Sequence, residues 1–360
     1  MQTHFTEEDL KKPHIREADR VLRTCVHCGF CNATCPTYQL LGDERDGPRG
    51  RIYLMKEMLE APEGADKVTE ETRLHLDRWL TCRNCETTCP SGVEYHKLLD
   101  IGRAEIERRV PRKPAERAQR YVLRKMLVEP KRFQALLKLG QTFKPLVPGA
   151  LRDKMPPAPV DAGQRPDGRQ HARQMLILEG CVQPGLSPNT NAATARVLDR
   201  LGIGLTPVAE AGCCGAVDFH MNAQDDGRAR ARANIDAWWP HLEAGAEAIV
   251  QTASGCGAFV KEYVDILKDD PAYAEKATRV SELAKDLVEV LRDEALDDLS
   301  VKQGRRLAFH CPCTLQHAQK LGGAVEGVLT QLGFSLTPVA DAHLCCGSAG
   351  TYSITQPELA

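Results

Sequence analysis

Two cysteine patterns constrain the fold of this chain more than any other feature of its sequence. A ferredoxin-type run, Cys25-x2-Cys28-x2-Cys31-x3-Cys35-Pro36, is followed by a shorter copy, Cys82-x2-Cys85-x3-Cys89-Pro90. In a long-range repeat, 31 residues separate one cysteine from a Cys-Cys-Gly triplet, first Cys181 and Cys213-Cys214-Gly215, then Cys313 and Cys345-Cys346-Gly347. Together the patterns contain 13 of the 15 cysteines, and both suit iron.

Composition excludes several classes of protein. The 42% apolar content supports packed cores, and a net charge of −2 gives no electrostatic case for a nucleic-acid partner. A secreted disulfide framework fits badly, because the cysteine count is odd and the N-terminus is polar. The sequence holds no run of roughly 18 apolar residues that could cross a bilayer. We therefore expect metal-bound thiolates in a reducing compartment, in a soluble or peripheral chain.

The order of predicted elements indicates an α+β fold. A helical, two-cluster ferredoxin-like domain (residues 1–103) precedes a basic helical connector with a Pro-rich linker (104–173). Two repeated α/β Cys-Cys-Gly domains follow (174–300 and 301–360), since Leu201–Glu210 matches Leu332–Asp341. A helical piece from Pro271 to Leu296 is expected to join these halves. The second domain is expected to be truncated, because the counterpart of Cys256 would fall near position 388.

The connector is strongly basic. Between Arg103 and Lys154 there are 15 Lys or Arg residues against five Asp or Glu residues, interspersed with apolar side chains. This pattern fits one or two amphipathic helices that either cover the cluster domain with a solvated outer face or dock a partner subunit or anionic lipid. The sequence leaves both interpretations open.

The spacing of the ferredoxin-type runs predicts which thiolates share a cluster. In two-cluster ferredoxins, the cysteine before the proline reaches across to the other cluster. Cys25, Cys28, Cys31 and Cys89 would then hold the first [4Fe-4S] cluster, and Cys35, Cys82 and Cys85 the second. Zinc is the rival metal for Cys-x2-Cys units, but the x2-x2-x3-Pro spacing argues against it.

Trp79 stands where the second run should have its first cysteine. An indole offers no lone pair to iron, so four thiolates are excluded unless another cysteine moves in. The second cluster could be [3Fe-4S], could take water, His75 or another non-cysteine ligand, or could be labile. The sequence does not choose among these three outcomes.

The Cys-Cys-Gly halves predict possible further cluster sites, whose ligands would converge from distant loops. The candidates are Cys181, Cys213, Cys214 and Cys256 in the first half and Cys313, Cys345 and Cys346 in the second. The glycine after each pair would permit a tight turn near the metal. Cys311 competes with Cys313, because its distance from the preceding strand fits equally well. His220, His310 and His343 are expected to be structural.

Several of these motifs together resemble one family. Cys25 to Pro36, Pro48-Arg49-Gly50-Arg51, Leu80 to Val93 and the two Cys-Cys-Gly repeats look like the iron–sulfur subunits of bacterial glycolate oxidases, over essentially the whole chain. The Cys-Cys-Gly halves alone also resemble subunits of heterodisulfide reductase, anaerobic glycerol-3-phosphate dehydrogenase and lactate-utilisation enzymes.

The resemblance implies an electron-transfer role in a complex. Separate flavin subunits would oxidise glycolate to glyoxylate, and this subunit would pass the electrons towards quinone at the inner face of the cytoplasmic membrane. Consistently, the sequence contains no G-x-G-x-x-G motif after a strand, so the chain is not expected to be catalytic alone. The resemblance also carries over seven cluster ligands, namely Cys25, Cys28, Cys31, Cys35, Cys82, Cys85 and Cys89. A heterodisulfide-reductase-like activity or a zinc-stabilised scaffold are the alternatives.

Overall fold

The computed structural model describes all residues except 66, 147–151, 153–155, 300 and 302–304. Parts of the predicted Pro-rich linker therefore lie outside the described residues. Two compact units emerge from the internal contacts. Unit 1 comprises residues 1–117, 310–322 and 339–360, and unit 2 comprises residues 118–309 and 323–338. The α+β prediction is confirmed, whereas the four sequence-based domain boundaries stay a prediction.

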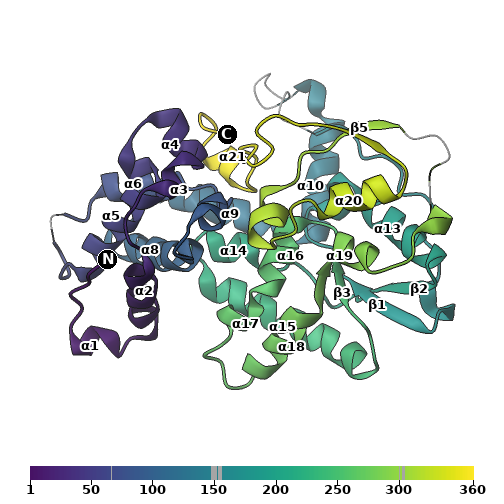
Figure 1. Cartoon of the computed structure of the whole chain (residues 1–360), viewed down its shortest axis with the longest axis horizontal. Helices are drawn as coiled ribbons and strands as arrows, with labels where there is room; N and C mark the ends of the chain where they lie inside the picture. The colour runs from purple at the N-terminus through teal and green to yellow at the C-terminus, as the bar shows by residue number, and fades with distance from the viewer. Residues whose placement is uncertain (66, 147–151, 153–155, 300, 302–304) are drawn as a thin grey trace. The chain divides into compact units, whose positions relative to one another are not determined.

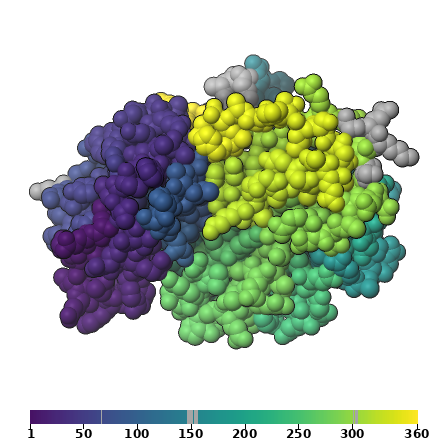
Figure 2. All heavy atoms as spheres, in the orientation of Figure 1, coloured from purple at the N-terminus to yellow at the C-terminus, as the bar shows by residue number. Residues whose placement is uncertain are grey.

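Unit 1 is built from helices. Its longer helices are α2 (Pro13–Thr24), α5 (Pro48–Glu60), α6 (Glu70–Asp77) and α8 (Tyr95–Arg109), and its shorter ones are α1 (Glu7–Leu10), α3 (Phe30–Ala33), α4 (Pro36–Leu41), α7 (Asn84–Thr88) and α21 (Tyr352–Thr355). Helix α8 packs against α2, α5 and α6, as Figure 1 shows in purple and blue. Side chains fill the gaps between these ribbons in the space-filling view (Figure 2).

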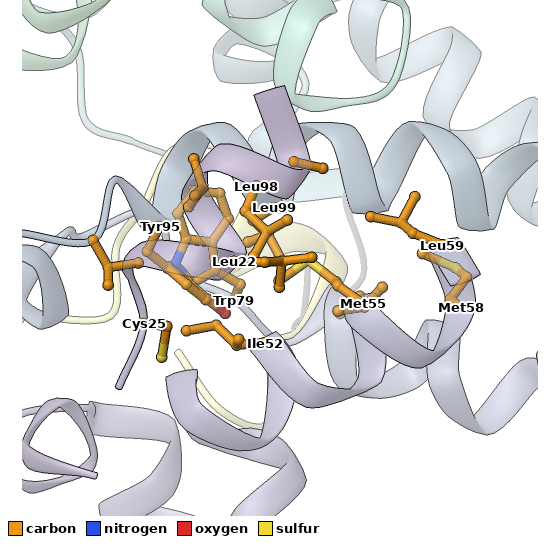
Figure 3. Packing of buried hydrophobic residues seen from close by; sticks show 14 of the residues in the cluster. Leu22, Cys25, Ile52, Met55, Met58, Leu59, Trp79, Tyr95, Leu98 and Leu99 are labelled. Atoms are coloured by element: carbon orange, nitrogen blue, oxygen red, sulfur yellow. The ribbon is translucent and has the colours of Figure 1, made fainter. Parts of the chain in front are cut away.

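The core of unit 1 brings apolar side chains and cysteines together. Leu22, Met55, Leu98 and Leu99 are fully buried in the same cluster as Trp79 (Figure 3). Cys25 and Cys85 belong to this cluster too. Hydrophobic burial therefore fixes the helices from which the cysteine loops project.

Proline and glycine define the boundaries of the short helices that carry cysteines. Cys35 precedes α4 and Pro36 is its first residue, where the missing N–H of proline costs nothing. Gly29 precedes α3 with φ of 88°, a left-handed conformation that suits glycine. A Cβ at Gly29 would lie 2.5 Å from the guanidinium of Arg49, so a larger residue would displace that arginine.

Unit 2 contains a parallel sheet in the order β2-β1-β3-β4. The strands are β1 (Arg173–Ile177), β2 (Ile203–Pro207), β3 (Ile249–Gln251) and β4 (Ala284–Asp286), with β5 (Arg306–Ala308) and β6 (Ser335–Thr337) in a separate parallel pair. Side chains alternate between the faces of β1, since Leu176 lies in one buried cluster while Met175 and Ile177 lie in another. Both faces of the larger sheet are therefore buried, as parallel sheets require.

Helices cover the larger sheet of unit 2. They include α13 (Pro188–Arg200), α15 (Gln224–Glu243), α16 (Ser254–Lys261), α18 (Ala274–Leu283) and α19 (Leu287–Arg292), with the shorter α12 (Gln183–Leu186), α14 (Ala216–His220) and α17 (Tyr263–Ile266) between them (Figure 1). The predicted repeat is visible in the strands, because β1–α13–β2 and β5–α20 (Ala324–Gln331)–β6 are both parallel pairs joined through a helix.

The predicted helical piece from Pro271 to Leu296 is wrong at its centre. Strand β4 interrupts it, because residues 284–286 pair with β3 as the fourth strand of the sheet. Asp286 then ends the strand and caps α19, accepting a hydrogen bond from the backbone N–H of Val288. The side chain of Glu289 accepts one in return from the N–H of Asp286, which completes a capping box.

Helices α9 (Pro114–Leu127) and α10 (Pro130–Thr142) form the connector, and neither has a buried residue. Tyr121, Val122 and Leu139 are at least half exposed. Within unit 2, α10 contacts α12. Each helix therefore has both basic and apolar side chains on its exposed surface.

Candidate metal centres

The first four predicted ligands line one cavity in unit 1. Cys25, Cys28, Cys31 and Cys89 all border it, together with apolar walls that include Ile52, Val93 and Tyr95. Cys85 also borders this cavity, so a thiol of the second predicted set lies beside the first set. Four thiols in one largely apolar cavity are the donor set that an iron–sulfur cluster requires.

The backbone of the cysteine loops supports the same conclusion. His27 between Cys25 and Cys28, and Thr81 and Arg83 on either side of Cys82, have positive φ values of 60°, 55° and 58°. Residues other than glycine rarely adopt this conformation, and it marks positions where function constrains the backbone. Such turns point successive N–H groups inward, which suits an anionic thiolate-bound cluster.

Burial makes the thiols of Cys25 and Cys31 unfavourable to ionise without a metal. It raises the pKa of Cys31 to about 12, with further contributions from Cys25 and Cys89. Burial is also the main reason for the raised pKa of Cys25. Bound iron would supply the positive charge that these thiolates lack, and binding would release their protons.

The second predicted set lies next to a buried charge network. Cys85 is fully buried, and burial raises its pKa, followed by the charges of Glu86 and Cys35. The Cys35 sulfur lies 3.3 Å from the Thr37 hydroxyl, which also accepts hydrogen bonds of 3.2 Å from the Arg51 guanidinium. The positive charge of this fully buried arginine opposes the rise in the pKa of Cys85. Arg51 therefore favours the thiolate form of Cys85 that a metal needs.

Asp46 neutralises this network. Its carboxylate lies 3.5 Å from Arg51, 2.9 Å from Arg78 and 3.0 Å from Nδ1 of His75. His75 is 3% exposed, and its Nε2 has no hydrogen-bond partner among the described residues. A carboxylate on one imidazole nitrogen is how many metal-binding histidines are oriented. His75 as a non-cysteine ligand stays a prediction.

The first Cys-Cys-Gly half brings its four candidate cysteines together in unit 2. Cys181 and Cys213 lie in one buried cluster, and Cys256 packs against the cluster that contains Cys214. Cys181, the Cys213–Cys214 pair and Cys256 follow β1, β2 and β3, so they meet at the carboxyl ends of parallel strands. That edge is the usual ligand-binding edge of an open α/β sheet.

Buried side chains hold the Cys213–Cys214 loop in place. Asn234 accepts a 2.8 Å hydrogen bond from the N–H of Gly212 and donates one of 3.0 Å to the carbonyl of Cys213. The Tyr263 hydroxyl donates one of 2.6 Å to the carbonyl of Cys214. Gly215 has φ of 101°, and a Cβ there would lie 2.7 Å from a backbone oxygen, so the expected tight turn requires glycine.

The second Cys-Cys-Gly half places its cysteines in unit 1. The Cys313 thiol donates a 3.8 Å hydrogen bond to Cys345, which repeats the Cys181–Cys213 contact of the first half. Cys345 also packs against the buried cluster that contains Cys82. Cys346 is exposed and Cys311 is buried. The contact with Cys345 favours Cys313 over Cys311 as the counterpart of Cys181.

Two of the three histidines named from the sequence take part in ring packing or backbone hydrogen bonding. The ring of His220 packs edge-on against Phe219 and Phe259. The carbonyl of His343 accepts hydrogen bonds from Asn84 and His317. Sequence reasoning missed the roles of Asn84, which lies inside the Cys82-x2-Cys85 spacing, and of Asn234 and Tyr263, which belong to no motif.

Comparisons with known proteins agree with this organisation. Residues 21–93 match the family model of a 4Fe-4S dicluster domain. Residues 175–261 and 307–360 match the model of a cysteine-rich domain. These matches and the thiol sets define an iron–sulfur protein with one dicluster domain and two cysteine-rich segments.

Full-length relatives identify the family. The glycolate oxidase iron-sulfur subunit of Escherichia coli (strain K12) is 64% identical over 360 residues, 100% of this chain and 87% of the relative. A probable glycolate oxidase iron-sulfur subunit of Bacillus subtilis (strain 168) is 29% identical over 98% of this chain and 86% of its own length. Lactate utilization protein A of Exiguobacterium sp. is 26% identical over 50% of this chain and 73% of that protein. The chain belongs to the family of glycolate oxidase iron–sulfur subunits.

Proposed function

We propose that this chain is the electron-transfer subunit of a glycolate oxidase complex. Flavin-containing subunits would oxidise glycolate to glyoxylate, releasing two electrons and two protons. Bound iron–sulfur clusters would supply one-electron redox chemistry, which connects a two-electron flavin to a quinone acceptor. The observation that carries the proposal is the cavity lined by Cys25, Cys28, Cys31 and Cys89, with Cys85 of the second set on its wall.

The residues of this chain would position two clusters and control their surroundings. Cys25, Cys28, Cys31 and Cys89 would hold the first cluster, and Cys35, Cys82 and Cys85 would hold the second. The apolar walls would exclude water from the first cavity. Short separation between two redox centres favours stepwise electron transfer, and the shared wall supports such a separation.

The first Cys-Cys-Gly half supports a further cluster site in unit 2. Its ligands would be Cys181, Cys213, Cys214 and Cys256, whose thiols already contact one another. The buried Asn234 and Tyr263 would fix the loop that carries the adjacent pair.

We propose that the partner subunits bring the complex to the membrane. None of the helices within the described ranges is long and apolar enough to cross a bilayer. Peripheral association with the inner face of the membrane would bring the chain to quinone. The exposed apolar and basic face of α9 and α10 is our candidate docking surface for a flavin-containing subunit.

Anaerobic purification followed by iron, sulfide and EPR measurements tests the proposal. We expect iron with matching labile sulfide, and reduction by glycolate only when the flavin subunits are present. Zinc, or neither iron nor sulfide, would refute the electron-transfer role. Reduction of a disulfide substrate by the isolated, pre-reduced chain would instead favour a heterodisulfide-reductase-like activity.

A further inference from the structure

The side chain of Trp79 is turned into the core of unit 1. It is 6% exposed, and its ring centroid lies 5.9 Å from that of Tyr95 in an edge-on arrangement. Figure 3 shows Trp79 among Leu22, Ile52 and Tyr95. The indole therefore fills apolar space. The second predicted cluster is left with Cys82 and Cys85 from the second ferredoxin-type run and, by crossing over, Cys35 from the first run.

A thiol from the second Cys-Cys-Gly half lies beside this incomplete set. Cys82 belongs to a small buried cluster, and the side chain of Cys345 packs against that cluster. Cys35, Cys82, Cys85 and Cys345 all belong to unit 1.

Three polar contacts hold the Cys345 segment in this position. Asn84 donates a 2.8 Å hydrogen bond to the carbonyl of His343, two residues before Cys345. Buried His317 donates a 3.0 Å bond from Nε2 to the same carbonyl and accepts one of 2.9 Å from Thr87 at Nδ1. Asn84 and Thr87 both belong to α7, which begins between Cys82 and Cys85. The loop of the second ferredoxin-type run is therefore tied directly to the Cys345 segment.

Apolar packing adds to these contacts. Buried Tyr352 lies in one cluster with Leu80 and Cys82, against which Cys313 and Cys345 also pack. The Tyr352 hydroxyl donates a 3.2 Å hydrogen bond to the carbonyl of Arg78, immediately before Trp79. The segment is thus attached on both sides of Cys345, so its thiol is held near Cys82 in the folded state.

We infer that Cys345 supplies the fourth thiolate of the second cluster in place of the ligand that Trp79 cannot provide. This inference rests on the proposed function, because it presupposes that Cys35, Cys82 and Cys85 bind a cluster. It reassigns Cys345 from a separate Cys-Cys-Gly site to the ferredoxin-type site. The second cluster is then [4Fe-4S] with four cysteine ligands, rather than [3Fe-4S].

The test is removal and rescue of this thiolate in the full chain, purified anaerobically. The wild type should show no [3Fe-4S] EPR signal after purification. Cys345→Ala should lose one iron per chain and show that signal after oxidation with ferricyanide. The double variant Trp79→Cys/Cys345→Ala should recover both the iron and the wild-type spectrum. Circular dichroism would confirm that each variant is folded, which partial exposure of Cys345 favours.

Two control variants separate this inference from its competitors. Cys346→Ala removes the exposed neighbour and should leave iron content and spectra unchanged. Cys313→Ala should also retain all iron, since Cys313 only donates a hydrogen bond to Cys345. Loss of about four irons from both Cys313→Ala and Cys345→Ala would show an independent cluster there and would overturn the inference.

Failure of the inference and failure of the proposed function give different results. If the wild type holds two clusters and Cys345→Ala is indistinguishable from it, the fourth ligand is not Cys345 and only the inference fails. If the wild type already shows the [3Fe-4S] signal, the inference also fails while the electron-transfer role stands. If the wild type binds no iron, the proposed function itself fails.

Discussion

Replacing Asn234 with alanine should destabilise unit 2 by about 3 kcal/mol. This buried side chain makes three hydrogen bonds, with the N–H of Gly212, the carbonyl of Cys213 and the hydroxyl of Tyr263. Each bond contributes roughly 1 kcal/mol net, and alanine removes all three, although the Tyr263 hydroxyl keeps its bond to the carbonyl of Cys214. The loop that carries Cys213 would lose its main polar support.

The hydrogen bond between Asn234 and Tyr263 allows the predicted energies to be tested with a double variant. Tyr263→Phe removes the bond with Asn234 and the one to the carbonyl of Cys214, so it should cost about 2 kcal/mol. The double variant loses four different bonds and should cost about 4 kcal/mol, because the Asn234–Tyr263 bond is counted in both single variants. The coupling energy between the two positions is then about 1 kcal/mol.

Urea unfolding monitored by tryptophan fluorescence measures these energies. In a Trp79→Phe background, Trp238 and Trp239 are the remaining tryptophans of the chain, so fluorescence reports on unit 2. Trp238 is fully buried in the core around the Cys213–Cys214 loop and should respond strongly. A cost below about 1 kcal/mol for Asn234→Ala, or full additivity in the double variant, would refute the assignment of these bonds as the loop's support.

Three further predictions concern stability, pH and assembly. Arg51→Gln should cost about 3–5 kcal/mol because it leaves Asp46 buried with less compensating charge, whereas Arg78→Gln at a quarter-exposed site should cost about 1 kcal/mol; equal costs in chemical denaturation would contradict this. The metal-free chain should lose stability as pH rises from 9 to 12, because the pKa of the Cys31 thiol is near 9.0 in the unfolded chain and about 12 in the folded chain. The melting temperature of Cys31→Ser should depend less on pH in this range. An unchanged dependence of melting temperature on pH would count against the pKa shift. Leu139→Asp on the exposed face of α10 should weaken co-purification with the flavin subunits without changing iron content, and undiminished co-purification would argue against that docking surface.

Local spacing was sufficient to predict which four thiols of the first set lie together. Cys25, Cys28, Cys31 and the distant Cys89 line one cavity, as the crossing rule for paired runs requires. Short loops leave few geometries for such closely spaced thiols, so the sequence pattern nearly determines the arrangement. The conformation of Gly215 follows from the same kind of local constraint, because the Cys-Cys pair and the turn are adjacent.

Other features depend on contacts between distant segments and could not be predicted from local spacing. The strand at residues 284–286 has weak strand propensity and forms because β3 offers it a free edge, so helical periodicity on both sides misled the prediction. Asn234 and Tyr263 act on a loop more than 20 residues away in the sequence. Their side chains are recognisable as loop supports only once α15 and α17 are packed.

The second metal centre shows why a repeat in sequence does not guarantee a repeat in the site. Both halves join two parallel strands through a helix, and both pair an upstream cysteine with the first cysteine of the triplet. In the first half, Cys256 packs against the cluster that contains Cys214 of the triplet. In the second half, Cys345 of the triplet packs against the cluster that contains Cys82 of the ferredoxin-type run. On our inference, the thiol of Cys345 from the distant repeat supplies the ligand that Trp79 cannot provide at this centre. A chain built this way can retain four-thiolate ligation although neither motif, taken alone, contains four thiolates for it.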